Sequence, residues 1–401
     1  MTILPEAWRQ AVAAVVRRSH LVPPSAVGTL VNDVAGELGV ELTVYLVDHE
    51  QRQLRALAVA NEPERPPLAV DTSLAGRAFR TIQVQRAGAR PVRLLVPVVD
   101  GTERLGVLEV VLPDQLGDAT DEAIDGATLM AGMIGHLVVA KRAYGDAIEQ
   151  RRRSRPMTVA AELLWQLLPP LTFATPEMVI AAALEPCYEV GGDAFDYAVD
   201  GSTVRLGIFD AVGHGLRAAL TVAVALAATR AARRDGQDLD AIARAADNAL
   251  LDQFTDARFV TAVLAELDLR SGRLRYVNAG HPPAVLLRRG KAVRTLAAGR
   301  RPPLGLAQPQ ITVAEEDFEP GDRLMCYTDG VTEARDDAGV MFGLSRLIDA
   351  TEGASAAGLP AAETLRRLTH NVVDHQNGRL DDDASLLLLE WSTAAARRSM
   401  P

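Results

Sequence analysis

Four aspartates in the C-terminal two-thirds of the chain each stand at the edge of an apolar run. A carboxylate at the end of a buried strand is costly to desolvate unless a positive charge pairs with it. No lysine or arginine lies inside the four motifs, so we predict that a metal ion supplies the counter-charge. Ligands that are all oxygen favour hard cations, Mg²⁺ or Mn²⁺, over zinc. The motifs are Glu189-Val-Gly-Gly-Asp193-Ala-Phe-Asp196, Ile208-Phe-Asp210-Ala-Val-Gly-His-Gly215, Tyr327-Thr-Asp329-Gly-Val-Thr-Glu333 and Asp381-Asp382-Asp-Ala-Ser385.

Each motif alone has a simpler interpretation. The segment from Asp210 equally fits a strand-to-helix turn with the aspartate as cap, and Asp329-Gly330 equally fits a plain turn. An acidic triplet such as Asp381–Asp383 is usually solvated. Asp193, however, precedes Asp210 by one hairpin's length, so the two carboxylates are predicted to face each other across adjacent strands. Only the combination of the four motifs is specific.

The segment from Met178 to Trp391 alternates strand and helix patterns. Long local hairpins with paired helices between them favour an antiparallel α+β sandwich over a doubly wound parallel sheet. Strands are predicted at Val179–Leu184, Val204–Phe209, Phe259–Leu269, Leu274–Ala279, Ile311–Val313, Arg323–Tyr327 and Ala384–Trp391, and helices at Gly215–Arg234, Leu239–Phe254, Phe342–Ala350 and Leu359–Asp374.

Length and composition set the class of protein. A chain of 401 residues is expected to form two or three domains. The net charge of −10 argues against bulk binding of nucleic acid. The longest apolar stretch, Ala218 to Thr229, is too short to span a bilayer, and the first residues lack a signal-peptide pattern. We therefore predict a cytoplasmic protein without a membrane span, with Cys187 and Cys326 as buried, reduced thiols.

The N-terminal part, residues 1–117, combines helix and strand patterns. Helices are expected at 5–18, 25–38 and 73–80, and strands at 42–47, 54–59, 93–99 and 106–112. This order, with the helix Leu74-Ala-Gly-Arg-Ala-Phe79 and the hairpin around Asp100-Gly-Thr-Glu-Arg104, resembles a GAF domain with a core of about residues 20–115. The pattern has no cysteine for a bilin and no cyclic-nucleotide signature. A small-molecule ligand and a structural or dimerising role both remain open.

Residues 118–168 carry a helical stripe that includes Met130, Ile134 and Leu137. Pro156 interrupts this stripe, and Pro169-Pro170 ends it. We interpret it as a helical linker whose apolar face packs on a second copy or on the next domain, and we expect a homodimer, since dimers are the commonest closed assembly. A solvated connector is the alternative.

The motifs of residues 169–392 resemble PPM-type (type 2C-like) serine/threonine phosphatases, in the branch of sporulation protein II E and the sigma-B regulatory phosphatases. The four acidic motifs occur in order with Tyr276-Val-Asn-Ala-Gly-His-Pro-Pro283 and Pro303-Leu-Gly305. The resemblance implies an αββα sandwich with two Mn²⁺ or Mg²⁺ ions per active site. Residues 393–401 are then predicted to form a flexible tail.

The resemblance also implies roles for individual residues. Asp210 is expected to bridge the metals and Ala211 to offer its backbone carbonyl, while Asp329 and Asp382 hold the second metal's side. Asp193 would act as a direct ligand or through a bound water. Two cations that clamp a phosphate and acidify a bridging water make a protein nucleophile unnecessary.

Some positions depart from the family pattern or have two interpretations. His214 follows Asp-Ala-Val-Gly rather than Asp-Gly, so a general-acid role does not transfer to it, and it equally supports the turn. We find no counterpart of the family's phosphate-gripping arginine, and Ser385 replaces a usual threonine. Asn278 and His281 either fix their own loop by hydrogen bonds or contact the substrate. The remaining supporting residues are Asp196, in the first motif, and Glu333, which is expected to order the Asp329 loop.

These observations lead to one hypothesis and two rivals. The hypothesis is a cytoplasmic, metal-dependent protein serine/threonine phosphatase gated by the N-terminal domain. By resemblance its substrate is a phosphoserine or phosphothreonine protein, an anti-sigma-factor antagonist of the STAS type. The rivals are a catalytically silent interaction module and a ligand receptor acting through the GAF-like domain.

Overall fold

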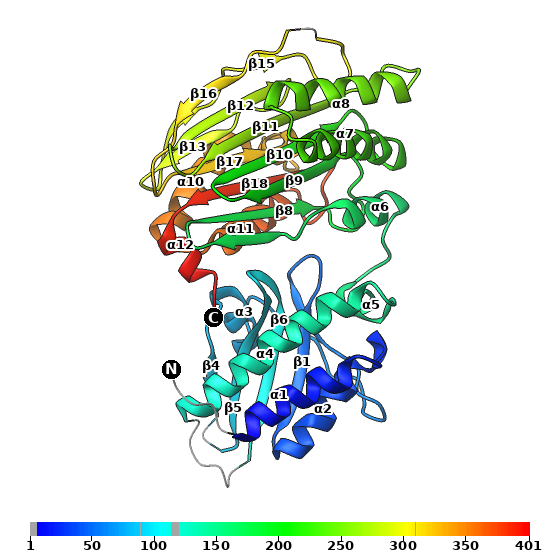
Figure 1. Ribbon diagram of the computed structural model, residues 1–401, viewed down its shortest axis with the longest axis vertical. Helices are drawn as coiled ribbons and strands as arrows, with labels where there is room; N and C mark the ends of the chain where they lie inside the picture. The colour runs from blue at the N-terminus through cyan, green and yellow to red at the C-terminus, as the bar shows by residue number, and fades with distance from the viewer. Residues whose placement is uncertain (1–5, 89, 114–119, 309) are drawn as a thin grey trace. The chain divides into compact units, whose positions relative to one another are not determined.

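The computed structural model describes residues 6–88, 90–113, 120–308 and 310–401 (Figure 1). These residues form two compact units that divide the chain between Arg155 and Pro156, with the residues from Arg398 onward grouped with the first unit. The predicted linker, 118–168, therefore does not form a part of its own. Its first two helices belong to the first unit, and its last helix belongs to the second.

The first unit is built on a six-stranded antiparallel sheet in the order β3-β2-β1-β6-β5-β4. Its long central strands pair over most of their length, β1 with β6 and β5 with β6. The strands are β1 Glu41–Val47, β2 Gln53–Ala56, β3 Leu68–Ala69, β4 Gln85–Ala87, β5 Val92–Asp100 and β6 Glu103–Leu112. The helices are α1 Glu6–Ser19, the 3-10 turn η1 Pro24–Ala26, α2 Val27–Leu38, α3 Leu74–Thr81, α4 Asp121–Arg142 and α5 Ala147–Arg152.

Helix α4 buries its apolar stripe inside the first unit. Met130 and Ile134 are 0% exposed and Leu137 is 7% exposed, in one core with residues of α1, α2 and the sheet. The prediction that Ile134 and Leu137 face a second copy is therefore wrong, because helical periodicity does not tell which core receives an apolar face. In the described part of the chain α4 is the one helix whose length and hydropathy would suit a membrane span, and this buried face is typical of a core helix.

The second unit stacks two sheets between pairs of helices, and both sheets are antiparallel except for the short parallel pair β12–β15 (Figure 1). One sheet has the order β15-β12-β11-β10-β9, with β16 paired to β12, and the other has the order β14-β13-β17-β18-β8-β7. The strands are β7 Thr172–Thr175, β8 Met178–Glu185, β9 Asp193–Asp200, β10 Thr203–Ala211, β11 Val260–Asp268, β12 Arg273–Ala279, β13 Val285–Arg288, β14 Lys291–Thr295, β15 Arg300–Arg301, β16 Ala314–Asp317, β17 Arg323–Tyr327 and β18 Ala384–Trp391.

Helices α7 and α8 pack on the first of these sheets, and α10 and α11 cover the second. Alternation along β18 shows the layering: Leu387 and Leu389 join the core between the sheets, whereas Leu386 and Leu388 join the core under α11. The unit is thus the predicted α+β, αββα sandwich. Its helices are α6 Val159–Leu167, α7 Leu216–Arg234, α8 Leu239–Gln253, α9 Asp329–Thr332, α10 Gly343–Ala356, α11 Ala361–His375 and α12 Thr393–Arg398.

Two predictions for this unit are wrong. The strand expected at Ile311–Val313 lies instead at β16, where Glu315 pairs across the sheet with Arg275, so ion pairs rather than an apolar run mark this edge. The tail expected to be flexible contains α12. The Ser392 hydroxyl accepts the Ala395 N–H at 3.2 Å, and Ala395 and Ala396 are buried in the second unit.

Candidate functional site

Strands β9 and β10 place the first two predicted aspartates side by side. They pair antiparallel with Asp210 directly opposite Asp193, as the hairpin spacing predicted. Residues in such a pair point to the same face of the sheet, with Cβ atoms about 4.5–5.5 Å apart. Asp196 lies on the other face of β9, where Arg230 and Arg233 of α7 hold it at 2.7 and 2.6 Å. Asp193 and Asp210 therefore face the second sheet, and Asp196 anchors α7 to β9.

The second sheet brings the other two aspartates to the same place. Strand β17 ends just before Asp329, β18 begins just after Asp382, and the two strands pair antiparallel, so these ends are adjacent. The charges on Asp329 and Asp382 both act to raise the pKa of Asp210. Four aspartates from two sheets thus form one carboxylate cluster.

Thr328 joins the two sheets at this cluster. Its buried hydroxyl donates to Asp193 Oδ2 at 2.8 Å and accepts the Ser385 N–H at 2.9 Å. The Ser385 and Thr328 side chains both act to lower the pKa of Asp193. Thr328 was not predicted as a site residue, although it stands directly before Asp329 in the Tyr-Thr-Asp-Gly motif.

Asp383 is a second residue that the sequence analysis missed. Its Oδ2 accepts the N–H groups of Gly191, Gly192 and Asp193 at 2.8, 2.6 and 3.3 Å. A Cβ on Gly191 would lie 2.6 Å from Gly215 N, so the close approach of the two turns requires glycine there. Asp383 therefore fixes the Gly-Gly turn that carries Asp193, whereas Asp382 remains available to the cluster.

Crowding and burial keep the carboxylates protonated at higher pH than usual. Burial, together with the charges of Asp329, Asp382 and Asp383, raises the pKa of Asp210 to about 8. Burial and the charge of Asp210 raise the pKa of Asp193 well above its ordinary value. Burial also raises the pKa of Asp382, which the nearby charge of His214 opposes. The cluster therefore favours the binding of a positive charge.

The cluster fits a hard divalent cation by its chemistry. Within the described ranges, no lysine or arginine forms an ion pair with Asp193, Asp210, Asp329, Asp382 or Asp383. The position that a Cβ on Gly192 would fill is ringed by oxygens: Ala211 O at 3.1 Å, Gly213 O at 3.2 Å and Asp383 Oδ2 at 3.6 Å. No three His, Cys, Asp or Glu side chains of the described residues converge closely enough to ligate one ion directly. Binding would thus require these side chains to close on the cation.

The remaining predicted residues surround the cluster in different ways. His214 is exposed on the turn between β10 and α7, within electrostatic reach of Asp382. Glu333 is exposed, and its backbone N–H donates to Asp329 O at 2.7 Å. It is the Glu333 backbone, therefore, that closes the turn begun by Asp329.

Asn278 and His281 hold their own loop. Asn278 Oδ1 accepts the His281 N–H, and Asn278 Nδ2 donates to His281 O, both at 2.9 Å. His281 Nδ1 lies 2.7 Å from the hydroxyl of Thr261, which stands opposite Asp210 on β11. Burial lowers the pKa of His281 to about 3, so its ring is neutral. These contacts are those required by the loop-fixing interpretation, and they connect this loop to the strand beside Asp210.

Residues 200–392 match the family model of Stage II sporulation protein E (SpoIIE). The match contains Asp210, Asp329 and Asp382. This part of the chain is therefore similar to the SpoIIE family. The matched range begins inside β9, so it covers most of the two-sheet unit and none of the first unit.

Three relatives illustrate the similarity. The phosphoserine phosphatase RsbU of Bacillus subtilis is 24% identical over 214 residues, 52% of this chain and 62% of that protein. The phosphoserine phosphatase RsbP of the same organism is 29% identical over 151 residues, 36% of this chain and 37% of that protein. The RsbU and RsbW domains of Rv1364c from Mycobacterium tuberculosis are 26% identical with a TM-score of 0.48, over 57% of this chain and 64% of that one. The chain spans less than two thirds of each.

Proposed function

We propose that this protein is a metal-dependent protein serine/threonine phosphatase. The observation that carries the proposal is the cluster of Asp193, Asp210, Asp329 and Asp382, with raised pKa values for three of its members and, among the described residues, no lysine or arginine paired with it. The match of residues 200–392 to the SpoIIE family supports the same activity.

The cluster would hold two Mn²⁺ or Mg²⁺ ions. Asp210, the Ala211 carbonyl, Asp329 and Asp382 would hold them, and Asp193 would act directly or through water. When bound, the ions supply positive charge for the phosphate oxygens and acidify a water molecule. The protein's own part is to orient the ligands: the Thr328 hydroxyl holds Asp193, and Asp383 holds the backbone of Gly191 and Gly192.

We further propose that the substrate is a phosphoserine or phosphothreonine protein of the STAS anti-sigma-factor antagonist type. The support is the similarity to RsbU and RsbP, whose names identify them as phosphoserine phosphatases. Purified STAS phosphoproteins from the same genome provide the test. Release of phosphate from one of them, at least tenfold faster than from an unrelated phosphoprotein, is the expected result.

Control by the first unit, which we propose to be a GAF-like sensor, has a structural support in α6. Arg230 on α7 donates to Leu167 O at the end of α6 at 2.8 Å, and the same guanidinium binds Asp196 on β9. Asp196 lies on the strand that begins with Asp193. A movement of α6, the first helix after the division between the units, would therefore be passed through Arg230 and Asp196 to β9, the strand that carries Asp193 of the carboxylate cluster.

The activity is tested with a matched pair of aspartates. Hydrolysis of p-nitrophenyl phosphate should require Mn²⁺ and stop in EDTA, and Asp382→Asn should lower the rate at least 100-fold, because it removes a metal ligand. Asp381→Asn, one position away and exposed, should keep the wild-type rate. Calorimetric titration with Mn²⁺ should show weaker binding for Asp382→Asn alone. Full activity after metal stripping, or equal loss in both variants, would refute the proposal.

A further inference from the structure

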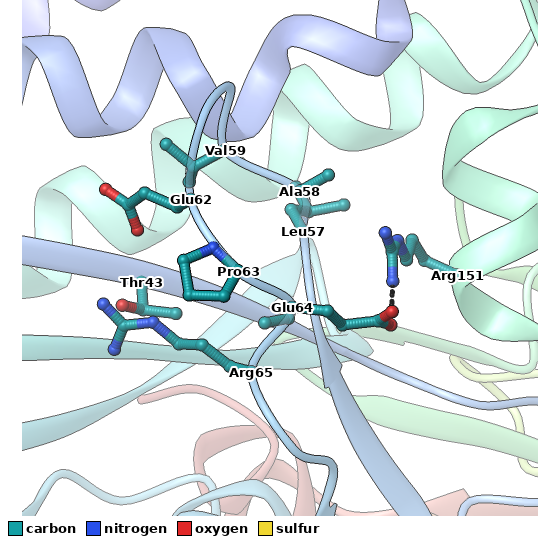
Figure 2. Close-up of a pocket in the computed structure, with 10 residues that line it drawn as sticks. Thr43, Leu57, Ala58, Val59, Glu62, Pro63, Glu64, Arg65 and Arg151 are labelled. Atoms are coloured by element: carbon teal, nitrogen blue, oxygen red, sulfur yellow. Dashed lines mark hydrogen bonds and ion pairs between the residues drawn. The ribbon is translucent and has the colours of Figure 1, made fainter.

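The first unit contains a small cavity beside the segment that follows β2. Its volume is about 70 Å³ (Figure 2). The wall combines apolar groups, among them Leu57 and Pro63, with the polar and charged side chains of Thr43, Glu62, Glu64, Arg65 and Arg151. All of these residues belong to the first unit, so the cavity is independent of the carboxylate cluster.

Thr43 offers this cavity a hydroxyl that has no protein partner. Thr43 lies on β1, is 6% exposed and lines the cavity. Within the part of the chain that the structure describes, its hydroxyl forms no hydrogen bond. The hydroxyl is accessible from the cavity rather than enclosed by protein. A polar group inside the cavity would satisfy it.

Arg65 offers the cavity a cation whose protein partners are Glu109 and the Tyr45 hydroxyl. Its nearest carboxylate is Glu109, at 3.8 Å, beyond normal hydrogen-bond distance. Glu109 is also approached by Arg93 at 3.6 Å and by the Tyr45 hydroxyl at 3.4 Å. Arg65 can therefore turn toward a ligand without leaving Glu109 isolated. Figure 2 shows Arg65 and Thr43 on one side of Pro63, and the Glu64–Arg151 ion pair on the other.

We propose that this cavity binds a small monocarboxylate. The carboxylate would lie on the Arg65 guanidinium, which suits its planar geometry, and would accept a hydrogen bond from Thr43. A short alkyl group would pack on Leu57 and Pro63. A cavity of about 70 Å³ is roughly half of one that holds benzene, near 150 Å³, so only a few heavy atoms fit and nucleotides are excluded.

A ligand in the cavity would also affect α5, near the C-terminal end of the first unit's main segment. Glu64, the neighbour of Arg65, pairs with Arg151 on α5. Helix α5 ends at Arg152, shortly before the chain enters the second unit. A ligand that orders Arg65 would thus stabilise the position of α5. This inference adds a ligand site to the proposed phosphatase and does not depend on its activity.

The test compares molecules of one size and different charge on the full chain. Saturation-transfer NMR at constant ionic strength should show that propionate binds with a dissociation constant of about 1 mM, an affinity within reach of five heavy atoms. Propylamine and 1-propanol should bind at least tenfold more weakly. Equal binding of propionate and 1-propanol would overturn the proposal. Tighter binding of inorganic phosphate would overturn the choice of a carboxylate.

Two substitutions and one control locate the ligand. Arg65→Gln and Thr43→Val should each weaken propionate binding at least fivefold. Arg93→Gln should leave it unchanged, because Arg93 approaches the same Glu109 but does not line the cavity. An equal loss in Arg93→Gln would overturn the site. If Thr43→Val fails to fold, Arg65→Gln decides alone, since that side chain is 39% exposed and its replacement is tolerated.

Discussion

At the scale of single residues, the carboxylates of the cluster repel one another, and a bound cation would offset this repulsion. Each aspartate with a raised pKa favours the protonated form in the folded protein, whereas an unfolded aspartate ionises near pH 3.9. Folding without metal is therefore opposed once the pH exceeds about 4, and binding of a divalent cation must release protons. The arrangement suits a site in which a bound metal ion, rather than a protein side chain, stabilises the ionised carboxylates.

A stability measurement tests this repulsion at Asp210. Its folded pKa of about 8 lies above the unfolded value, so between about pH 4 and 8 the folded state holds the extra proton. Stability of the metal-free wild type should therefore fall as pH rises, by up to about 1.4 kcal/mol per pH unit for this group. Asp210→Asn does not titrate and should lose this slope, which makes it the more stable protein at pH 8.

Urea unfolding in EDTA at pH 5 to 8 measures the difference. Asp381→Asn, an exposed neighbour of the cluster, serves as the control and should follow the wild type. Parallel stability curves for Asp210→Asn and wild type would show that Asp210 is not part of a repulsive cluster.

At the scale of helices and strands, Arg230 ties three elements together. It binds Leu167 O of α6 and Asp196 of β9 from its place on α7, whereas the Arg233 guanidinium binds Asp196 alone among the residues that the structure describes. Arg230→Gln and Arg233→Gln should both destabilise the second unit, by about 1–3 kcal/mol for a lost buried partner of Asp196. Only Arg230→Gln should also speed amide exchange at the end of α6.

Hydrogen–deuterium exchange of the peptide that contains residues 164–168 makes this comparison. Unchanged exchange there in Arg230→Gln would mean that the bond to Leu167 O does not hold α6. Faster exchange in Arg233→Gln as well would point to general loosening of α7 instead of a specific link.

Local patterns predicted most elements, and the failures occur where tertiary contacts decide. The spacing of Asp193 and Asp210 was enough to predict their pairing, because a hairpin fixes register locally. Thr328 and Asp383 were missed because each acts across two sheets or two turns that lie far apart in sequence. Helix α4 was correctly predicted as amphipathic, yet its apolar face covers the first unit's own sheet. Periodicity identifies a buried face but not what buries it.

At the scale of the whole molecule, two units with separate cores should respond separately to ligands. The first unit's core contains α1, α2, α4 and its sheet, and the second unit's cores lie around its two sheets. The carboxylate cluster belongs wholly to the second unit. A ligand stabilises only the cooperative unit that binds it, by about 2.7 kcal/mol at one hundred times its dissociation constant.

Scanning calorimetry of the full chain should therefore show two transitions, with Mn²⁺ raising the midpoint of one by several degrees and leaving the other in place. Asp382→Asn, which lacks a proposed metal ligand, should lose that rise while keeping both transitions. A single transition that moves as a whole with Mn²⁺ would show that the units unfold as one. In that case the free energy of metal binding also stabilises the first unit against unfolding.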